Sequence, residues 1–368
     1  MLNRIKALRQ KLKINGLDAI LTGHAPNRGY ISGFTGSDGW VIVTAERAML
    51  LVDFRYVEQA KLESPHFETC YIKSDITDWL PTYMLALGTK HLGIESEYMP
   101  VAQHQLIHQA LREKVPSAQV VQTKNIIESL RLYKDDAELQ FITKACEIAD
   151  MAVGYTQSHL RAGITEKQFA WELESFMRQN GSESMPFEII LASGPNAALP
   201  HGRAGDRIIV EGEPVVIDMG ARYQGYCSDI TRTFIIGKEE HNFDKIYNVV
   251  LSAQEAALEL IKPDMQASTA DSLVRSMIAN AGYGKYFGHG LGHGIGIETH
   301  ELHRLATKGD GLLQEGMVFT IEPGIYIPGW GGVRIEDTVA IKDGKIVCLT
   351  RSDKKALIAG GKKHDRCW

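Results

Sequence analysis

Short apolar runs alternate with helix-like stretches over the first third of the chain. The runs at residues 17–21, 40–43, 49–52 and 119–121 have the length of buried strands, and residues 56–63 have a helix-like composition. Strands that alternate with helices in this way predict an α/β domain.

The chain begins with an amphipathic pattern. Leu2, Ile5, Leu8 and Leu12 recur at helical spacing, and lysines and arginines lie between them. We expect a first helix that packs its apolar face on the α/β domain. A helix that lies on a membrane surface is the alternative that this pattern leaves open.

The pattern changes near residue 125. From there on, charged and apolar residues follow a helical spacing, and neither Gly nor Pro occurs before Gly154, which predicts a long helix and a domain boundary. The length of 368 residues also exceeds what one hydrophobic core usually fills. We therefore expect two domains, residues 1–125 and residues 126–368.

Two segments of the C-terminal half have the same layout. Each contains an apolar strand ending in an acid, a glycine two residues later, a turn, and a second strand with another acid. The acids are Asp218 and Asp229 in the first segment, and Glu322 and Glu336 in the second. With turns near the intervening glycines, each segment forms a β-hairpin whose two acids lie opposite each other. The two hairpins would direct four carboxylates inward.

Four inward carboxylates need compensating positive charge, because like charges that face each other among Val, Ile and Phe are destabilising. Nearby arginines are too few to neutralise them, whereas two divalent cations would balance all four charges. A glycine-rich segment between the hairpins supplies His289, His293 and His300 as candidate nitrogen ligands. A lone histidine in such a loop is more often structural, but three so close together favour a metal site.

Composition narrows the class of protein. The hydrophobic fraction of 44% and the charged fraction of 23% are typical of a soluble globular protein. A formal net charge of −5 provides no basic field for phosphate, so we do not expect nucleic acid as a partner. The five cysteines include no C-x-x-C pair, and no apolar stretch has the length of a transmembrane segment. We expect a cytoplasmic protein without a membrane partner.

Together these residues resemble the M24 "pita-bread" metallopeptidases, in the branch of Xaa-Pro aminopeptidases (aminopeptidase P) and prolidases. The resemblance covers nearly the whole chain, and the sequences around Asp218 and Asp229 are close to those of the family. Residues 33–37 and 53–60 are similar to the creatinase-type domain of the same branch. The resemblance implies an α/β (α+β) architecture, with a creatinase-type N-terminal domain and a pita-bread catalytic domain with pseudo-twofold duplicated β-hairpins, assembled as a homodimer.

The resemblance also implies a role for each site residue. Five residues would bind two metal ions: Asp218, Asp229, His293, Glu322 and Glu336. Glu322 would in addition exchange protons with the reacting water. His201 and His300 would donate hydrogen bonds to the substrate without binding metal, and core histidines are the alternative. Tyr326 and Arg334 would order the site or contact the substrate.

Two positions bear on specificity. Arg304 stands where some prolidases hold the carboxylate of a dipeptide, and a solvated surface arginine is the alternative. At the third position after His300 the family commonly has proline, whereas this chain has His303. This departure affects the expected specificity more than the expected chemistry.

The implied function is hydrolysis of the peptide bond between an N-terminal residue and a following proline by a hydroxide that bridges two metal ions. Oxygen and nitrogen ligands without thiolate favour Mn²⁺, with Co²⁺ or Zn²⁺ as alternatives. The expected substrates are small peptides with proline in the second position, either dipeptides or longer peptides. The alternative functions are a methionine aminopeptidase-like exopeptidase, which shares the ligand set, and a non-catalytic pita-bread binding protein.

Overall fold

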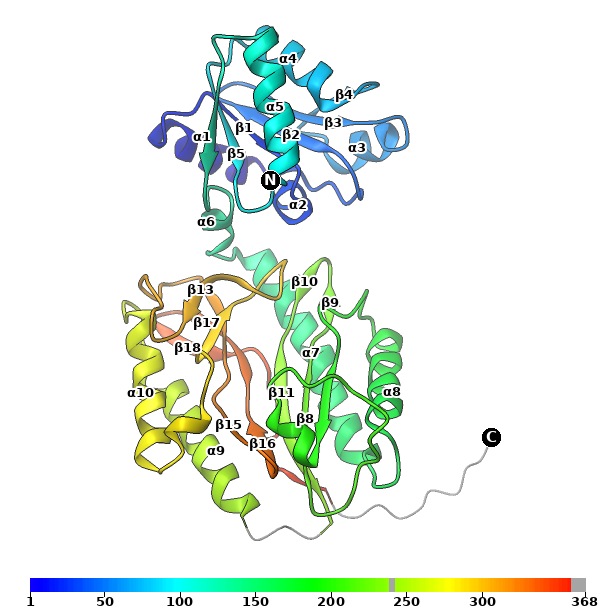
Figure 1. Cartoon of the computed structure of the whole chain (residues 1–368), viewed down its shortest axis with the longest axis vertical. Coiled ribbons are helices and arrows are strands. Elements are labelled where there is room, and N and C mark those ends of the chain that lie inside the picture. The colour runs from blue at the N-terminus through cyan, green and yellow to red at the C-terminus, as the bar shows by residue number, and fades with distance from the viewer. Residues whose placement is uncertain (238–241, 359–368) are drawn as a thin grey trace. The chain divides into compact units, whose positions relative to one another are not determined.

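The computed structural model describes residues 1–237 and 242–358, and the chain forms two compact units, Met1–Arg131 and a second that begins at Leu132 (Figure 1). The domain boundary that the sequence predicts at residue 125 lies a few residues before the division between the two units. It falls between strand β6 (Gln119–Thr123) and the short helix α6 (Glu128–Arg131). That boundary stays a prediction.

The first unit is a mixed sheet with helices packed on it. The strands lie in the order β4-β3-β2-β1-β5-β6, and β1 is antiparallel to β2 and parallel to β5. The strands are β1 (Ala19–Thr22), β2 (Trp40–Thr44), β3 (Ala48–Val52), β4 (Glu68–Tyr71), β5 (His91–Glu95) and β6. The helices besides α6 are α1 (Leu2–Ile14), α2 (Ala25–Ser32), α3 (Val57–Glu63), α4 (Ile76–Leu87) and α5 (Val101–Lys114). The prediction of an α/β domain is confirmed.

Helix α1 packs as the amphipathic pattern predicts. Ile5, Leu8 and Leu12 are buried, and Leu2 at its start is exposed. Over residues 1–237 and 242–358, no helix combines the length and the apolar composition that crossing a membrane requires.

The second unit consists of two similar halves, each with a pair of helices packed against curved strands (Figure 1). Helices α7 (Asp136–His159) and α8 (Glu166–Gln179) pack on a sheet of order β19-β11-β8-β7. Helices α9 (Phe243–Leu260) and α10 (Ala267–Asn280) pack on a sheet of order β13-β12-β14-β17-β18. Each half therefore has its own hydrophobic core, as the predicted duplication requires.

The strands of the first half are β7 (Ile190–Ser193), β8 (Pro214–Met219), β11 (Ile230–Ile236) and β19 (Leu357–Ile358). Those of the second half are β12 (Gly292–Gly294), β13 (Glu301–Leu305), β14 (Val318–Ile321), β17 (Asp337–Lys342) and β18 (Lys345–Cys348). Two short ribbons complete the hairpins: β9 (Arg222–Tyr223) with β10 (Tyr226–Cys227), and β15 (Gly324–Ile327) with β16 (Gly331–Arg334). Two 3₁₀ turns, η1 (Gly194–Ala198) and η2 (Gly284–Tyr286), lie in the connections.

The long helix predicted from the sequence is present as α7. Its expected start is wrong, because residues 128–131 form the separate helix α6. Asp135 accepts a hydrogen bond from the backbone N–H of Glu138, and the Glu138 side chain accepts one from the backbone N–H of Asp135. This capping box starts a new helix. Tyr133, in the gap, pairs with Met317 in an isolated β-bridge. The helical spacing of apolar residues continues across the gap, so periodicity alone does not reveal it.

The cysteines in the described part of the chain form no disulfide. Cys70, Cys146, Cys227 and Cys348 are free thiols, and Cys367 lies outside the described residues. Burial raises the pKa of Cys227 to about 12, so this thiol stays protonated near neutral pH and is a poor metal ligand.

Candidate metal centre

The first hairpin has a different register from the predicted one. Asp218 on β8 lies opposite Thr231 on β11, so the prediction that Asp218 faces Asp229 is wrong by two residues. The reason is the turn, in which Gln224 and Gly225 adopt positive φ angles of 47° and 78°. Because side chains alternate along a strand, a shift of two residues keeps the same face. Both acids therefore still line one cavity.

The second hairpin has the predicted register. Ile321 lies opposite Asp337, and Gly324 lies opposite Arg334. The same register on both sides places Glu322 and Glu336 at facing positions between the two ladders. The predicted pairing of these two acids is confirmed.

One cavity of about 420 Å³ in the second unit brings the candidate site residues together. Its wall contains every residue to which the sequence analysis gave a role: His201, Asp218, Asp229, His293, His300, Arg304, Glu322, Tyr326, Arg334 and Glu336. His289, an early nitrogen candidate without an assigned role, lies in the same wall. The roles themselves remain predictions, which the surrounding contacts support to different degrees.

His293 presents a neutral nitrogen to the carboxylates. Its Nδ1 lies 3.1 Å from the carbonyl oxygen of Gly294 and so carries the hydrogen, which leaves a lone pair on Nε2. That Nε2 lies 3.5 Å from Glu322 Oε1 and 3.7 Å from Asp229 Oδ2. Burial, and next the charge of His300, lower the pKa of His293 to about 4. The neutral imidazole is the form that binds metal.

Two glycines allow His293 to reach this position. A Cβ atom on Gly292 would lie 1.9 Å from the carbonyl oxygen of Thr320, and one on Gly294 would lie 2.0 Å from that of Leu302. Any side chain there would therefore force the neighbouring strands apart. The backbone N–H of His293 donates to Thr320 Oγ1 at 3.1 Å, which fixes the strand in the sheet.

The carboxylates share a surplus of negative charge. Burial, and then the charges of Glu336, Asp218 and Glu322, raise the pKa of Asp229 well above its ordinary value. Burial, and then the charges of Glu322 and Asp218, raise the pKa of Glu336 in the same way. Burial also raises the pKa of Glu322 to about 8. Such acids stay ionised at neutral pH only where cations compensate them.

The oxygen atoms of the cluster fit bound cations. Oδ1 of Asp218 and Oδ1 of Asp229 are buried and accept no hydrogen bond within the described residues. Asp229, His293 and Glu336 each offer a ligand atom, and these atoms lie within 4.8 Å of one another. Carboxylate oxygens with one neutral imidazole suit hard or borderline divalent ions. The residues present therefore fit the metal ions that the sequence predicts.

Arg334 connects the acids to the opposite wall. It is buried, and its Nη2 donates to Asp218 Oδ2 at 2.7 Å. Its Nη1 donates to the hydroxyl of Tyr326 at 2.8 Å and to the carbonyl oxygen of Pro200 at 3.1 Å. Arg334 thus neutralises one of the four carboxylates and holds the residue that precedes His201.

His289 ends this chain of hydrogen bonds. Its Nδ1 donates to the carbonyl oxygen of Gly290 at 2.7 Å, so its Nε2 accepts from the hydroxyl of Tyr326 at 2.9 Å. Burial, and next the charge of Arg334, lower the pKa of His289 to about 4. The sequence alone assigns no role to His289, although this residue stands between glycines just as His293 does.

The loop that carries His201 depends on Glu166, a residue that the sequence analysis did not identify. Glu166 is fully buried at the start of α8. Its Oε1 accepts hydrogen bonds from the backbone N–H and the hydroxyl of Ser193, both at 2.8 Å, and its Oε2 accepts one from Gly205 N–H at 3.1 Å. Asn196 donates to both oxygens. One carboxylate thus holds both ends of the segment that contains His201.

The cavity mouth contains two more candidates. Arg304 on β13 lies opposite His293 on β12 and is exposed. The ring of His300 lies 4.2 Å from the ring of His293, centroid to centroid. Desolvation, and next the charge of Arg304, lower the pKa of His300, so its imidazole is neutral near pH 7. His303, where the family commonly has proline, instead lies against Gly311.

The duplicated hairpins and their carboxylate-lined cavity are those of a metallopeptidase. The chain belongs to metallopeptidase family M24, whose model matches residues 140–343, and it also carries the Creatinase/Prolidase N-terminal domain over residues 4–133. The predicted family, fold class and enzyme class, a metallo-exopeptidase of this type, are confirmed. Membership in the family implies divalent metal ions.

Relatives and solved structures resemble the chain over nearly its whole length. A Xaa-Pro dipeptidase of Pyrococcus horikoshii is 40% identical over 358 residues, which cover 97% of this chain and 99% of that protein. A solved Xaa-Pro dipeptidase from Bacillus anthracis has a TM-score of 0.93 at 40% identity and covers 97% of this chain and 99% of its own. A solved X-Pro aminopeptidase from Thermotoga maritima has a TM-score of 0.87 at 36% identity. The match covers 95% of this chain and 99% of that protein.

Glu166→Gln should loosen the loop that carries His201. A glutamine amide directs an NH₂ group at N–H donors that the carboxylate now satisfies, and leaving one buried donor unsatisfied costs about 1–3 kcal/mol. We expect faster hydrogen–deuterium exchange in residues 193–205 and a lower free energy of unfolding. Glu172→Gln is the matched control, because Glu172 lies on the same helix and pairs with Arg161 at the surface. Equal exchange in both variants would contradict this role of Glu166.

Proposed function

We propose that the chain is a dinuclear-metal Xaa-Pro dipeptidase, which hydrolyses the bond between an N-terminal residue and a C-terminal proline. The observation that carries this proposal is the position of Arg304, directly across the β12–β13 pair from the candidate ligand His293. Two relatives of nearly equal length, from Pyrococcus horikoshii and Bacillus anthracis, are named Xaa-Pro dipeptidases, which supports the same assignment.

Five residues of the cavity would hold the metal ions: Asp218, Asp229, His293, Glu322 and Glu336. When bound, two divalent ions, for which Mn²⁺ is our first choice, would supply an acidified water and polarise the scissile carbonyl. Asp229 and Glu336 would take part in holding both ions, as the resemblance to the family implies, and His293 would hold one of them. The ligand atoms of these three residues lie within 4.8 Å of one another. Arg334 keeps Asp218 oriented through the bond to its Oδ2.

Glu322 is placed for proton transfer. Thr320 Oγ1 donates to its Oε1 at 3.3 Å, and its Oε2 lies 4.0 Å from His289 Nδ1. The carboxylate would take the proton of the attacking water and later pass it to the nitrogen of the leaving proline. His201 and His300, both exposed in the cavity wall, would donate hydrogen bonds to the carbonyl oxygen as it becomes negative.

Arg304 would select dipeptides. In a dipeptide the carboxylate belongs to the leaving proline, so it lies within a few bonds of the reacting carbonyl. An exposed guanidinium on the strand beside His293 can form a paired hydrogen bond with such a carboxylate. In a longer peptide the same position carries an amide, which gains nothing from the charge.

The comparisons bear differently on two other functions. The similarity to the Thermotoga maritima X-Pro aminopeptidase favours a peptidase that accepts longer peptides. A methionine aminopeptidase-like activity is disfavoured, because residues 4–133 match the Creatinase/Prolidase N-terminal domain. A homodimer and a cytoplasmic location, expected from the sequence and the resemblance, stay predictions.

Substrate comparison tests the proposal directly. Protein stripped of metal and reloaded with Mn²⁺ should hydrolyse Ala-Pro well and Ala-Pro-Ala poorly. Arg304→Ala should raise KM for Ala-Pro about 10- to 100-fold, because a hydrogen bond to a charged group is worth ~1.5–3 kcal/mol. The KM for Ala-Pro-amide, which has no carboxylate, should stay unchanged. Arg161→Ala, at a surface arginine, is the control. Preferred cleavage of Ala-Pro-Ala would favour the aminopeptidase, and cleavage of Met-Ala-Ser alone would refute the proposal.

Asp229→Asn tests the metal centre. The substitution keeps the shape of the side chain but removes one of the negative charges that would bridge the ions, so metal content and activity should be lost together. Metal per chain is measured by plasma mass spectrometry beside the rate of Ala-Pro hydrolysis. Asp244→Asn, at an exposed position of α9, should change neither. Full activity of Asp229→Asn would rule out a bridging role for Asp229.

His300→Ala separates catalysis from metal binding. Removal of one preorganised donor to the reacting oxygen commonly lowers kcat by about 10²–10³-fold, while the five ligands remain in place. We therefore expect wild-type metal content with kcat reduced by about 100-fold. His66→Ala, at an exposed histidine of the first unit, is the control. An unchanged kcat would remove His300 from the mechanism.

A further inference from the structure

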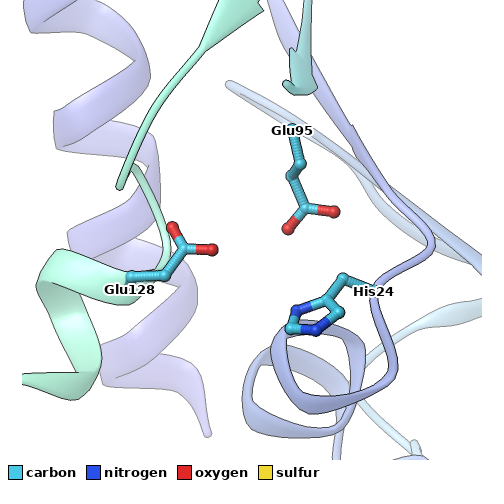
Figure 2. Close-up of side chains that lie close together, drawn as sticks. All are labelled: His24, Glu95 and Glu128. Atoms are coloured by element: carbon cyan, nitrogen blue, oxygen red, sulfur yellow. The ribbon is translucent and has the colours of Figure 1, made fainter. Parts of the chain in front are cut away.

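His24, Glu95 and Glu128 come together in the first unit from three separate elements. His24 precedes α2, Glu95 ends β5, and Glu128 begins α6. Each offers a ligand atom, and these atoms lie within 4.8 Å of one another. Figure 2 shows the imidazole and the two carboxylates directed toward a common space.

The two carboxylates are oriented by one amide. Asn27 Nδ2 donates to Glu95 Oε1 at 2.6 Å and to Glu128 Oε1 at 2.5 Å, and Asn27 Oδ1 accepts from Arg131 Nη1 at 2.8 Å. Thr22 Oγ1 donates to Glu95 Oε2 at 2.6 Å. Each carboxylate oxygen has two lone pairs, so these bonds leave lone pairs for a further ligand. Outer hydrogen bonds that fix the ligand side chains are typical of metal sites.

The imidazole of His24 is also fixed in place. Its ring stacks on Tyr98 with a centroid distance of 3.6 Å and an angle of 7° between the planes. A cavity of about 300 Å³ lies beside the cluster, and His24, Glu95, Tyr98 and Gln103 contribute to its wall. An ion and its water molecules can therefore approach His24 and Glu95 from this cavity, and Glu128 lies within reach of the same position.

The charges favour a cation. Glu95 is 8% exposed, and burial, with Glu128 adding its negative charge, raises the pKa of Glu95 to about 7. Arg131, which donates to Asn27 Oδ1, contributes one positive charge. The two carboxylates carry two negative charges when both are ionised. The cluster therefore keeps a negative charge that a bound cation would compensate.

We propose that His24, Glu95 and Glu128 form a divalent-cation site in the first unit, made of residues other than the ligands of the candidate centre in the second. One nitrogen and two carboxylate oxygens form a donor set that suits Zn²⁺, with water as the remaining ligand. The site goes beyond the proposed peptidase activity and does not depend on it.

Zinc binding by the full-length protein tests this site. Protein stripped of metal is dialysed to equilibrium against buffered Zn²⁺, and the metal per chain is measured by plasma mass spectrometry. Glu128→Gln and His24→Asn should each bind one Zn²⁺ per chain fewer than the wild type, with an unchanged circular dichroism spectrum. Glu97→Gln is the matched control, because this exposed acid lies two residues from Glu95 and pairs with Lys124 at the surface.

The same comparison in an Asp229→Asn background separates the two sites. In Asp229→Asn the centre of the second unit should bind less metal, so the Zn²⁺ that remains should belong to the site in the first unit. Adding Glu128→Gln to this variant should remove that remaining Zn²⁺. Equal Zn²⁺ content in the wild type, Glu128→Gln and His24→Asn would overturn the proposal. A loss of Zn²⁺ in Glu97→Gln as large as that in Glu128→Gln would overturn it as well.

Discussion

The mutual repulsion of four carboxylates around one cavity is the constraint on which the second unit depends. A fold can hold such a group only where each acid comes from a rigid strand end and where positive charge is available. The two hairpins satisfy the first requirement, because each delivers two acids to the cavity wall from its own sheet. Arg334 meets part of the second through its bond to Asp218. The buried Oδ1 atoms of Asp218 and Asp229 accept no hydrogen bond from the described residues, which leaves them free to bind cations.

Acids that are neighbours in the sequence have opposite electrostatic surroundings. Glu336 faces the cavity, and its pKa is raised well above the ordinary value by burial and by Glu322. Asp337, the next residue, points to the other side of the strand, where Arg232 and Lys354 lie 2.8 and 3.0 Å from its oxygens. Although burial alone would raise the pKa of Asp337, these two cations lower it. A fully paired acid stabilises the sheet, whereas an acid without local compensation marks a functional site.

The sequence predicted four of the six strands of the first unit, β1, β2, β3 and β6, but not β4 or β5. It also predicted the duplicated hairpins and the candidate residues of the cavity, because these follow from apolar spacing and from the order of acids and glycines. It did not predict the register of the first hairpin, since that depends on the backbone angles of Gln224 and Gly225. Glu166 was missed for a different reason. Its environment exists only once residues 193–205 fold over the start of α8, and no local pattern encodes that contact.

The two arginines of the cavity wall differ in what they can still bind. Arg334 is buried, and its guanidinium already donates to Asp218, Tyr326, Thr231 and Pro200. It cannot turn to a substrate without leaving a carboxylate uncompensated, which would cost more than a new hydrogen bond gains. Arg304 is exposed on β13. Among the described residues that line the cavity, Arg304 is therefore the arginine available to an anionic substrate group. This difference in exposure and in hydrogen bonding supports the roles proposed for the two arginines.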